Sequence, residues 1–318
     1  MPTLSEYANL TNTDDLTRGV YKTLLTTDAL MAMLAFKSFE GTAFAWNEES
    51  SHPTTTSFAV GSTWQDSEPT FTRRTTNLAI VGVQSPLDRY AMQTRSSVQS
   101  QKAVLLEQMS RSLARKIGQY VIKGDSAVTS TEFDGLDRYC RTRTRMMAMD
   151  DGVIDGPGAA ETELTLDRLD AAVDQVDDGA TKPDALVMNT TMRRKLTSLS
   201  RASGSGVVLD SINLFGHKVT TYDGIPILLS NWITNEETYA DASTWASSTA
   251  TTIFAVKFGQ EKDGFTLIHN GSVLNPDVQD VGIKENKNEN LYRMVVYLGS
   301  VVFSPKQIIA LGGIDSAA

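Results

Sequence analysis

Hydrophobic residues recur at spacings of three and four positions in the N-terminal segment, residues 1–35. These apolar positions are Leu16, Val20, Leu24, Leu25, Leu30, Met31 and Leu34. The spacing predicts a short amphipathic helix. Polar threonines and aspartates interrupt it, so two interpretations stay open. The helix packs on its own domain, or it belongs to an arm that reaches a neighbouring subunit.

The most strongly periodic segment runs from Ser85 to Gly124. Its apolar stripe consists of Leu106, Met109, Leu113, Ile117 and Tyr120, with Arg111, Arg115 and Lys116 off the stripe. Ser85 suits an N-cap and Pro86 the first helical position, while Gly124 suits the C-terminal end. A helix of about 35 residues would span roughly 50 Å. This length indicates a strut laid across a sheet.

Residues 36–77 have a different pattern, in which threonine, serine and aromatic residues dominate. Such residues favour strands, and EESSHP (48–53) predicts the tip of a hairpin. Two strands alone cannot bury so many aromatic side chains on both faces. We therefore expect the hairpin to lie on its own domain or on a partner, and the exposed aromatics favour the partner.

From about Gly124 to Gly264 the pattern is mixed α/β. We expect helices at 165–176 and 190–200, strands at 184–189, 217–231 and 251–259, and a surface loop at 238–250. The segment 217–231 reads as two strands joined by a turn at Asp223–Gly224. Further strands are expected at 265–271 and 292–304, with the charged connection 284–290 between them.

Charge and composition narrow the classes of function. The chain has 29 Lys and Arg against 38 Asp and Glu, a formal net charge of −9. This balance argues against a basic surface that grips nucleic acid phosphates. The single cysteine, Cys140, excludes an internal disulfide framework and fits a reducing compartment. The N-terminus lacks the pattern of a secretory signal, and no apolar run is long enough for a membrane helix.

Candidate chemical sites are weak throughout the chain. The three histidines, His52, His217 and His269, have no partners at metal-ligand spacing. The glycine turn at 204–206 has Leu209 where a dinucleotide fingerprint requires glycine. The acidic stretch 150–158 lacks the alternating ligands of a calcium loop. We therefore predict no catalytic, cofactor-binding or metal-binding residues, and no enzymatic activity.

One cationic run stands out, RYCRTRTR, from Arg138 to Arg145. The simpler interpretation is the solvated edge of a strand or loop. The functional alternative is a contact to acidic neighbours or to packaged nucleic acid. Tyr139 is its only aromatic residue, so a role in reading base sequence is not expected.

Four segments, in this order, resemble the major capsid proteins of tailed phages with the HK97-like fold. They are KGDSAVTSTEFDGL (123–136), PDALVMNTTMRRKLTSL (183–199), YDGIPILLSNWI (222–233) and YRMVVYLGSVVFSPKQIIALGGI (292–314). In the first, Thr131 stands where the family commonly has proline. The order of arm, hairpin, long helix, α/β segment and returning strands agrees with the same family.

The resemblance implies an α+β, HK97-like capsid fold. Its expected parts are an N-terminal arm (1–35), an extended β-hairpin E-loop (36–77), a peripheral domain with the spine helix (78–127 and 262–303), a mixed α/β axial domain (128–261) and a C-terminal strand and tail (304–318). Some relatives crosslink a loop lysine to a neighbour's asparagine. Lys37 is the only lysine of 36–77 and lies at the hairpin base, which does not fit that chemistry.

The resemblance also implies partners and a location. We expect pentamers and hexamers of the chain itself, forming an icosahedral shell that encloses double-stranded DNA without sequence-specific binding. A separate scaffolding protein, a portal, and assembly in the bacterial host cytoplasm before residence in the virion are expected as well. Two alternatives stay open: the shell protein of an encapsulin-type nanocompartment and a soluble α/β enzyme.

Overall fold

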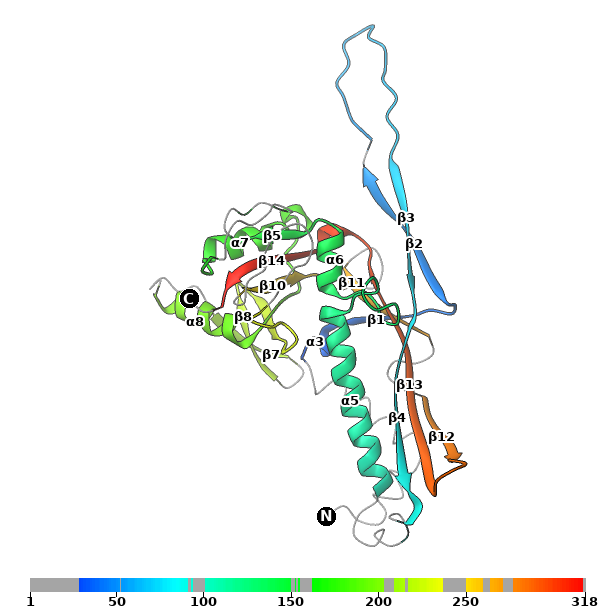
Figure 1. Cartoon of the computed structure of the whole chain (residues 1–318). Coiled ribbons are helices and arrows are strands. Elements are labelled where there is room, and N and C mark those ends of the chain that lie inside the picture. Colours follow the sequence, from blue (N-terminus) through cyan, green and yellow to red (C-terminus); the bar gives the residue numbers. More distant parts are fainter. Residues whose placement is uncertain are drawn as a thin grey trace.

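The computed structural model describes residues 29–51, 53–90, 93, 101–149, 152, 154, 162–202, 209–214, 217–236, 250–259, 264–270 and 277–316. Its main parts are a five-stranded sheet beside a long helix, a seven-stranded sheet with helices, and a two-stranded hairpin that projects from the body (Figure 1). Most of the predicted N-terminal helix lies outside the described residues. Its end forms α3 (Ala29–Met33), where Leu30 and Met31 pack in the chain's own core.

The five-stranded sheet is organised around β13 (Glu289–Val302). On one side β13 pairs with β4 (Ala79–Asp88), and on the other with β11 (Phe265–Asn270) and β12 (Asp277–Ile283), all antiparallel. The short strand β1 (Ala35–Ser38) adds to β11 in parallel. The predictions for 265–271 and 292–304 are confirmed, although β13 begins earlier, inside the expected connection. The sequence analysis missed β4 and β12.

The helix α5 (Gln101–Lys123) covers one face of this sheet. Its predicted apolar stripe is confirmed, because Leu106, Met109, Leu113 and Ile117 are buried in one core with strand residues such as Val81 and Met294. Tyr120 is partly buried against the same core. Arg111, Arg115 and Lys116 lie on the exposed side, also as predicted.

The predicted start of the long helix at Ser85 and Pro86 is wrong. Both residues lie in β4, where they pair with Tyr292 and Leu291 of β13. β4 pairs only with β13 among the described strands, so the missing N–H of Pro86 is tolerated at this sheet edge. The described helix has 23 residues, about 35 Å in length, instead of about 35 residues.

The seven-stranded sheet is the second large sheet of the body. Its strands are, in spatial order, β5 (Met146–Ala148), β14 (Ile308–Asp315), β10 (Ala250–Val256), β6 (Ala185–Met188), β9 (Ile225–Leu229), β8 (His217–Tyr222) and β7 (Leu209–Leu214). The helices α7 (Leu166–Asp174) and α8 (Thr190–Ala202), with the 3₁₀ turn Val176–Gly179, pack their apolar faces on it. The strands and helices predicted between 165 and 259 are confirmed, while the sequence analysis missed β5 and β7. The expected loop 238–250 lies outside the described residues except for Ala250, which is the first residue of β10.

The turn between β8 and β9 forms where the local sequence favours it. Asp223 and Gly224 have φ angles of 48° and 81°, the left-handed geometry of a two-residue hairpin turn. Asparagine, aspartate and glycine adopt this geometry most readily. The prediction of a turn at these two residues is confirmed.

The projecting hairpin consists of β2 (Ala43–Ser51) and β3 (Thr70–Asn77), which pair antiparallel (Figure 1). The predicted tip at 48–53 is wrong, because Glu48 to Ser51 belong to β2. The chain turns instead at 59–62, where the Ser62 N–H donates to the Ala59 carbonyl at 3.1 Å. Pro53 and Pro69 flank the loop, and since proline has no N–H to donate, strand pairing ends near them.

Candidate assembly hairpin and its basic anchor

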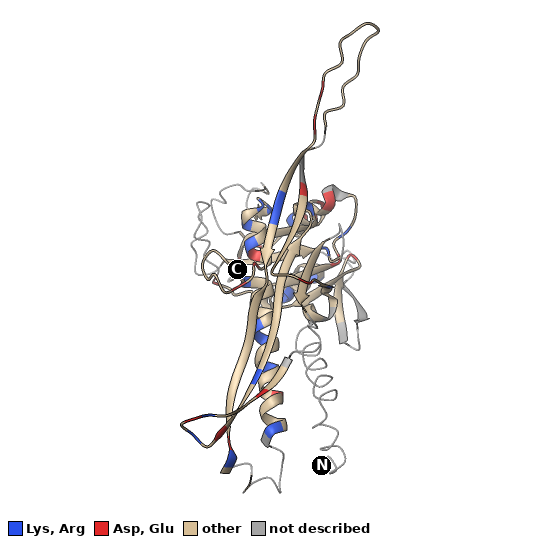
Figure 2. Ribbon diagram, turned by 90° about the vertical axis from the view of Figure 1, so that its right-hand side faces the viewer, with Lys and Arg blue, Asp and Glu red and all other residues tan. Residues whose placement is uncertain are grey.

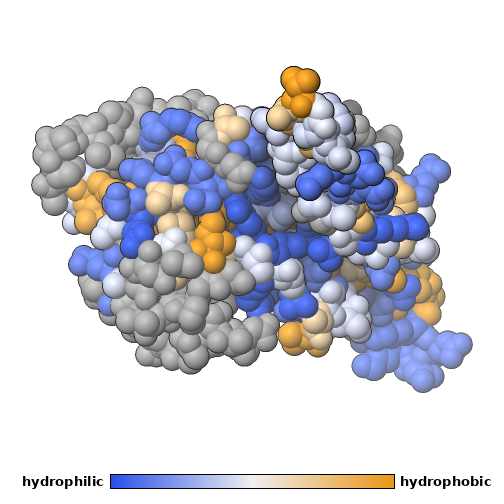
Figure 3. Space-filling view, turned by 90° about the horizontal axis from the view of Figure 1, so that it is seen from above, coloured by the Kyte–Doolittle hydropathy of each residue, from blue (hydrophilic) through white to orange (hydrophobic). Residues whose placement is uncertain are grey.

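The outer half of the hairpin carries exposed apolar side chains. The rings of Phe58 and Trp64 lie 4.3 Å apart between centroids, and Trp64 is 76% exposed. Val60, at the turn, and Phe71, at the start of β3, are also exposed. Viewed from above, hydrophobic groups stand open at the surface of the projecting hairpin (Figure 3). Exposed apolar groups of this size are typical of interaction surfaces.

The base of the hairpin packs on its own chain. Phe44 contacts Phe39 and Phe303 edge to face, with centroid distances of 5.2 and 6.3 Å. Trp46 lies 6.4 Å from Phe303, which follows β13. The ammonium group of Lys37, in β1, lies over the rings of Phe44 and Phe303. The expectation that the hairpin aromatics favour a partner is therefore wrong for the base.

The first part of the basic run is helical, and not the solvated strand or loop edge that the simpler interpretation expected, whereas 143–145 form the turn and loop that follow the helix. Residues 136–142 form the helix α6 (Leu136–Thr142), and Tyr139 and Cys140 on it are buried. Lysines and arginines recur along α5 and near the hairpin base (Figure 2). The arginines of the run, however, bind groups of the same chain.

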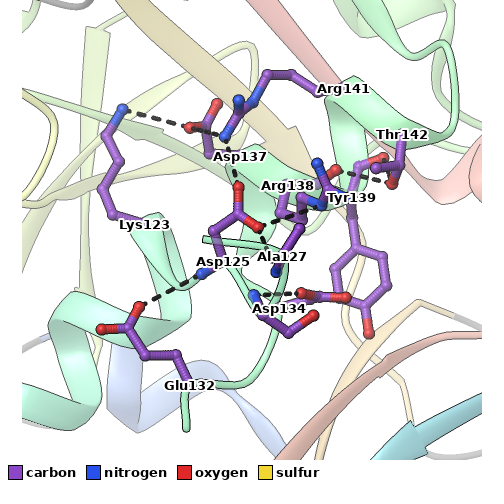
Figure 4. A network of polar contacts seen from close by, with 11 residues as sticks. Lys123, Asp125, Ala127, Glu132, Asp134, Asp137, Arg138, Tyr139, Arg141 and Thr142 are labelled. Carbon is purple, nitrogen blue, oxygen red and sulfur yellow. Dashed lines mark hydrogen bonds and ion pairs between the residues drawn. The ribbon is translucent and has the colours of Figure 1, made fainter. Parts of the chain in front are cut away.

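Two arginines of α6 join a compact ion-pair network with the end of α5. Arg138 and Arg141 each lie 3.4 Å from a carboxylate oxygen of Asp125, and Arg141 also lies 3.2 Å from Asp137 (Figure 4). Lys123, the last residue of α5, lies 3.6 Å from Asp137. Each of these side chains is at least about three-quarters buried, so the network fixes α6 against the helix end.

The connection between α5 and α6, residues 124–135, is closed at its two ends by glycines. The Gly135 N–H donates to the Gly124 carbonyl at 2.8 Å. A Cβ atom on Gly124 would lie 2.2 Å from the carbonyl oxygen of Phe133, too close for any side chain. Gly124 thus ends α5 as predicted, and the reason is the close backbone approach, since its φ is not positive.

The last two arginines of the run reach distant elements. Arg143 Nη1 donates to Glu48 Oε2 of β2 at 2.5 Å, across 95 positions of the sequence. Arg145 donates to the carbonyls of Ile308, the first residue of β14, and of Gln175, after α7. Tyr139 donates its hydroxyl proton to the Ser300 carbonyl of β13 at 2.8 Å. The run therefore joins the hairpin to both sheets.

Comparison with known proteins decides the family. The family model described as SU10 major capsid protein matches residues 4–264. The chain belongs to the SU10 major capsid protein family. No curated protein matches the sequence.

Solved structures share the fold of this capsid protein at low sequence identity. The SrpI encapsulin of Synechococcus elongatus PCC 7942 has a TM-score of 0.68 and 15% identity, covering 91% of this chain and 88% of that chain. The capsid of the empty GTA particle has a TM-score of 0.63 and 16% identity, covering 90% of each chain. The structure from Microbacterium phage Oxtober96 has a TM-score of 0.60 and 12% identity, covering 89% of this chain and 90% of that chain. The expected HK97-like α+β fold is confirmed.

Family membership gives the capsid protein its role. It is the shell-forming protein of a tailed phage, structural and not enzymatic, and it resides in the virion. Among the described residues no helix is both long and apolar enough to cross a membrane. Membership of the capsid family sets aside the alternative of a soluble α/β enzyme.

Some of the weak candidate sites from the sequence lie within the described residues, and others do not. In the described part of the chain, no three His, Cys, Asp or Glu residues are grouped to hold a metal ion. His217 lies in β8 and His269 in β11, on different sheets, and His52 lies outside the described residues, as do 204–206 and most of 150–158. Cys140 is buried, and burial raises the pKa of its thiol.

One polar hollow, of about 420 Å³, opens beside Asn189 and Ser230, where the parallel strands β6 and β9 end. The buried amide of Asn189 is already bonded there. It donates to Asn235 at 2.6 Å and to Thr251 at 3.1 Å, and its oxygen accepts from the Met192 N–H. The bond from Met192 caps α8, and together the three bonds indicate a structural role for Asn189.

Sequence reasoning missed one important group, Glu48. It was placed in a hairpin tip, whereas it is a buried carboxylate at the docked face of β2. A possible signal was the alternation of Phe44, Trp46 and Glu48 on one face of a strand. Its partner Arg143 lies too far along the chain for pattern analysis to connect the two.

Proposed function

We propose that this major capsid protein assembles with copies of itself, as pentamers and hexamers, into an icosahedral shell that encloses double-stranded DNA without sequence-specific binding. The observation that carries the proposal is the hairpin of a capsid-family chain, whose outer half is exposed and ends in an aromatic pair. A two-stranded hairpin in water is only marginally stable. Contact with a neighbouring copy would bury Trp64 and Val60.

We assign the parts of the shell subunit as follows. Residues 1–35 serve as the N-terminal arm, 36–77 as the E-loop, 78–127 and 262–303 as the peripheral domain with the spine helix, 128–261 as the axial domain, and 304–318 as the C-terminal strand and tail. Two pairings refine this division. Ala35–Ser38 belongs to the five-stranded sheet, so the projecting part begins at Ala43, and Ile308–Asp315 completes the sheet of the axial domain.

Assembly would use further partners in the host. We propose a separate scaffolding protein, a portal and assembly in the bacterial cytoplasm. These follow from the tailed-phage role of the family.

The first test is particle size. The purified protein should elute in the megadalton range and give closed shells in negative-stain microscopy. A small oligomer at every protein and salt concentration would contradict shell assembly. Nuclease treatment before purification, followed by an absorbance spectrum, tests whether the shells protect nucleic acid.

An encapsulin-type compartment is the second candidate, and the likeness to the SrpI encapsulin supports it at the level of the fold. A phage capsid and an encapsulin-type compartment differ in what their shells contain. Shells from infected cells should contain protected double-stranded DNA for a phage capsid. Shells that hold a co-purifying enzyme and no nucleic acid would favour the compartment.

A further inference from the structure

One face of β2 is turned toward the body of the subunit. The alternate residues Phe44, Trp46 and Glu48 share this face, as the period of two in a strand requires. Phe44 and Trp46 meet Phe303, and Glu48 meets Arg143. Their neighbours Ala45 and Asn47 are exposed. The hairpin is thus docked by three consecutive residues of one face.

The contact at Glu48 is the outermost of the three, and it is the one made by an ion pair. The side chains of Glu48 and Arg143 are 9% and 7% exposed. Arg74 of β3 donates to the same carboxylate oxygen at 3.1 Å, but its side chain is 45% exposed and belongs to the hairpin itself. Among the described residues, Arg143 is therefore the one that ties the carboxylate to the body.

Arg143 is held in place by α6. Its backbone N–H donates to the Tyr139 carbonyl at 3.0 Å, and its guanidinium lies over the Tyr139 ring, 5.8 Å from the ring centroid. Tyr139 is buried and bonded to Ser300 of β13. The guanidinium is consequently fixed relative to the five-stranded sheet, and a buried ion pair has a strict geometry because each charge lacks water to replace its partner.

A small change of direction at this contact is magnified along the hairpin. The hairpin extends at most about 40 Å beyond Glu48, at about 3.3 Å for each residue up to Val60. A tilt of 10° at Glu48 would displace the turn by about 7 Å, which exceeds the ~4.8 Å spacing of neighbouring strands. Phe58 and Trp64 would then miss a fixed contact surface.

We propose that Glu48 and Arg143 are positioning residues for shell assembly. Their ion pair sets the direction of the hairpin in the free subunit, so that the aromatic pair is presented to a neighbouring copy already oriented. Preorganised contacts avoid the entropy loss of ordering on binding. The inference rests on the proposed shell assembly for its consequence, whereas the direction of the hairpin is a property of one subunit.

The direct test measures the hairpin in unassembled subunits. Spin labels at Thr63→Cys, near the turn, and Ser126→Cys, on the body, report one distance by pulsed electron paramagnetic resonance; both positions are exposed and Cys140 is buried. The parent should give one narrow distance distribution. The variants Glu48→Gln and Arg143→Gln should give a broad distribution, and the reversed pair E48R/R143E should give a narrow one again.

Controls separate positioning from general damage. Glu107→Gln removes an exposed ion pair with Arg111 on α5 and should leave the distribution narrow. Arg74→Gln should broaden it less than Arg143→Gln. Far-ultraviolet circular dichroism checks that each variant is folded, and the reversed pair keeps the test decisive if a single variant unfolds. Narrow distributions in folded E48Q and R143Q would overturn the proposal.

The second test of the positioning role measures whether each variant forms shells. E48Q and R143Q should fail to form shells at the protein concentration at which the parent and E48R/R143E form them. Normal shells from variants with a broadened distribution would overturn the positioning role. If the parent itself forms no shells, the proposed function fails, while the distance measurement still decides whether the ion pair sets the hairpin direction.

Discussion

Leu113 and Arg111 lie two residues apart on α5, and their surroundings predict very different contributions to stability. Leu113 is 2% exposed within the main core. Arg111 lies on the exposed side of the helix, 2.6 Å from Glu107 one turn away. A buried leucine loses both its contacts and its filled volume on truncation, whereas an exposed ion pair is screened by water.

Leu113→Ala should therefore destabilise the free subunit by roughly 2–5 kcal/mol. Arg111→Ala should cost about 0–1 kcal/mol. Urea denaturation of unassembled protein gives both free energies of unfolding. Equal losses for the two substitutions would mean that the face of α5 is misassigned.

Tyr139 predicts a dependence of stability on alkaline pH. Burial raises its pKa to about 12, while the hydrogen bond with Ser300 acts in the opposite direction. The folded state thus holds the phenol proton more tightly than the unfolded state. The stabilisation is complete below pH 10 and is lost as the pH rises from 10 to 12.

Tyr139→Phe removes this titration. Its unfolding free energy should fall less steeply than that of the parent between pH 10 and 12, by up to about 1.4 kcal/mol for each pH unit. Cys140 and Tyr222 also have raised pKa values, but they are present in both proteins and cancel in the comparison. Parallel stability curves would contradict the assignment.

At the scale of single elements, the outer part of the hairpin can be separated from its anchor. Ser51 and Thr70 are paired at the end of the regular strands. Replacing residues 52–69 by Asn-Gly would close the strands with a two-residue turn and leave the contacts of Glu48 and Trp46 intact. The shortened protein should fold with the stability of the parent and fail to close into shells.

Negative-stain microscopy and thermal unfolding together check this outcome. The double variant F58S/W64S is the matched control, because it keeps the length of the loop and removes its aromatic pair. It should also reduce shell formation. Normal shells from the shortened protein would show that the hairpin end is not an assembly element.

Elements differed in how far the sequence could predict them. α8, β6 and the Asp223–Gly224 turn follow local rules, so periodicity and turn chemistry placed them well. At Ser85–Pro86 the local signals for a helix start were outweighed by pairing with β13, some 200 positions later. The basic run was misread for the same reason, since Glu48, which binds Arg143, is remote in sequence.

On the scale of the whole molecule, most of the fold was predictable only through the resemblance to a capsid family. Residue patterns alone supplied separate helices and strands, but not the pairing order of either sheet. The strand β13 illustrates the limit. Its side chains alternate in the sheet, yet nothing in its own sequence specifies three different partner strands.

The charge of the whole subunit predicts weak binding to free DNA. The net charge is −9, and Arg138, Arg141 and Arg143 are engaged by carboxylates of the same chain. Unassembled subunits should show a shallow dependence of log affinity on log salt concentration, measured by fluorescence anisotropy with a labelled duplex. A slope that corresponds to several phosphate contacts would contradict this prediction.

The position of β14 has a consequence for the timing of synthesis. This buried strand is inserted between β5 and β10, and it follows every other strand of its sheet in the chain. A nascent chain that has not yet released residues 308–315 from the ribosome therefore leaves the edge of β10 open, and its subunit is incomplete. Translation itself thus delays assembly until the whole body is made. Ending the chain after Ser304 should yield aggregated protein in sedimentation assays, whereas supplying residues 305–316 as a separate peptide during refolding should recover part of it in soluble form.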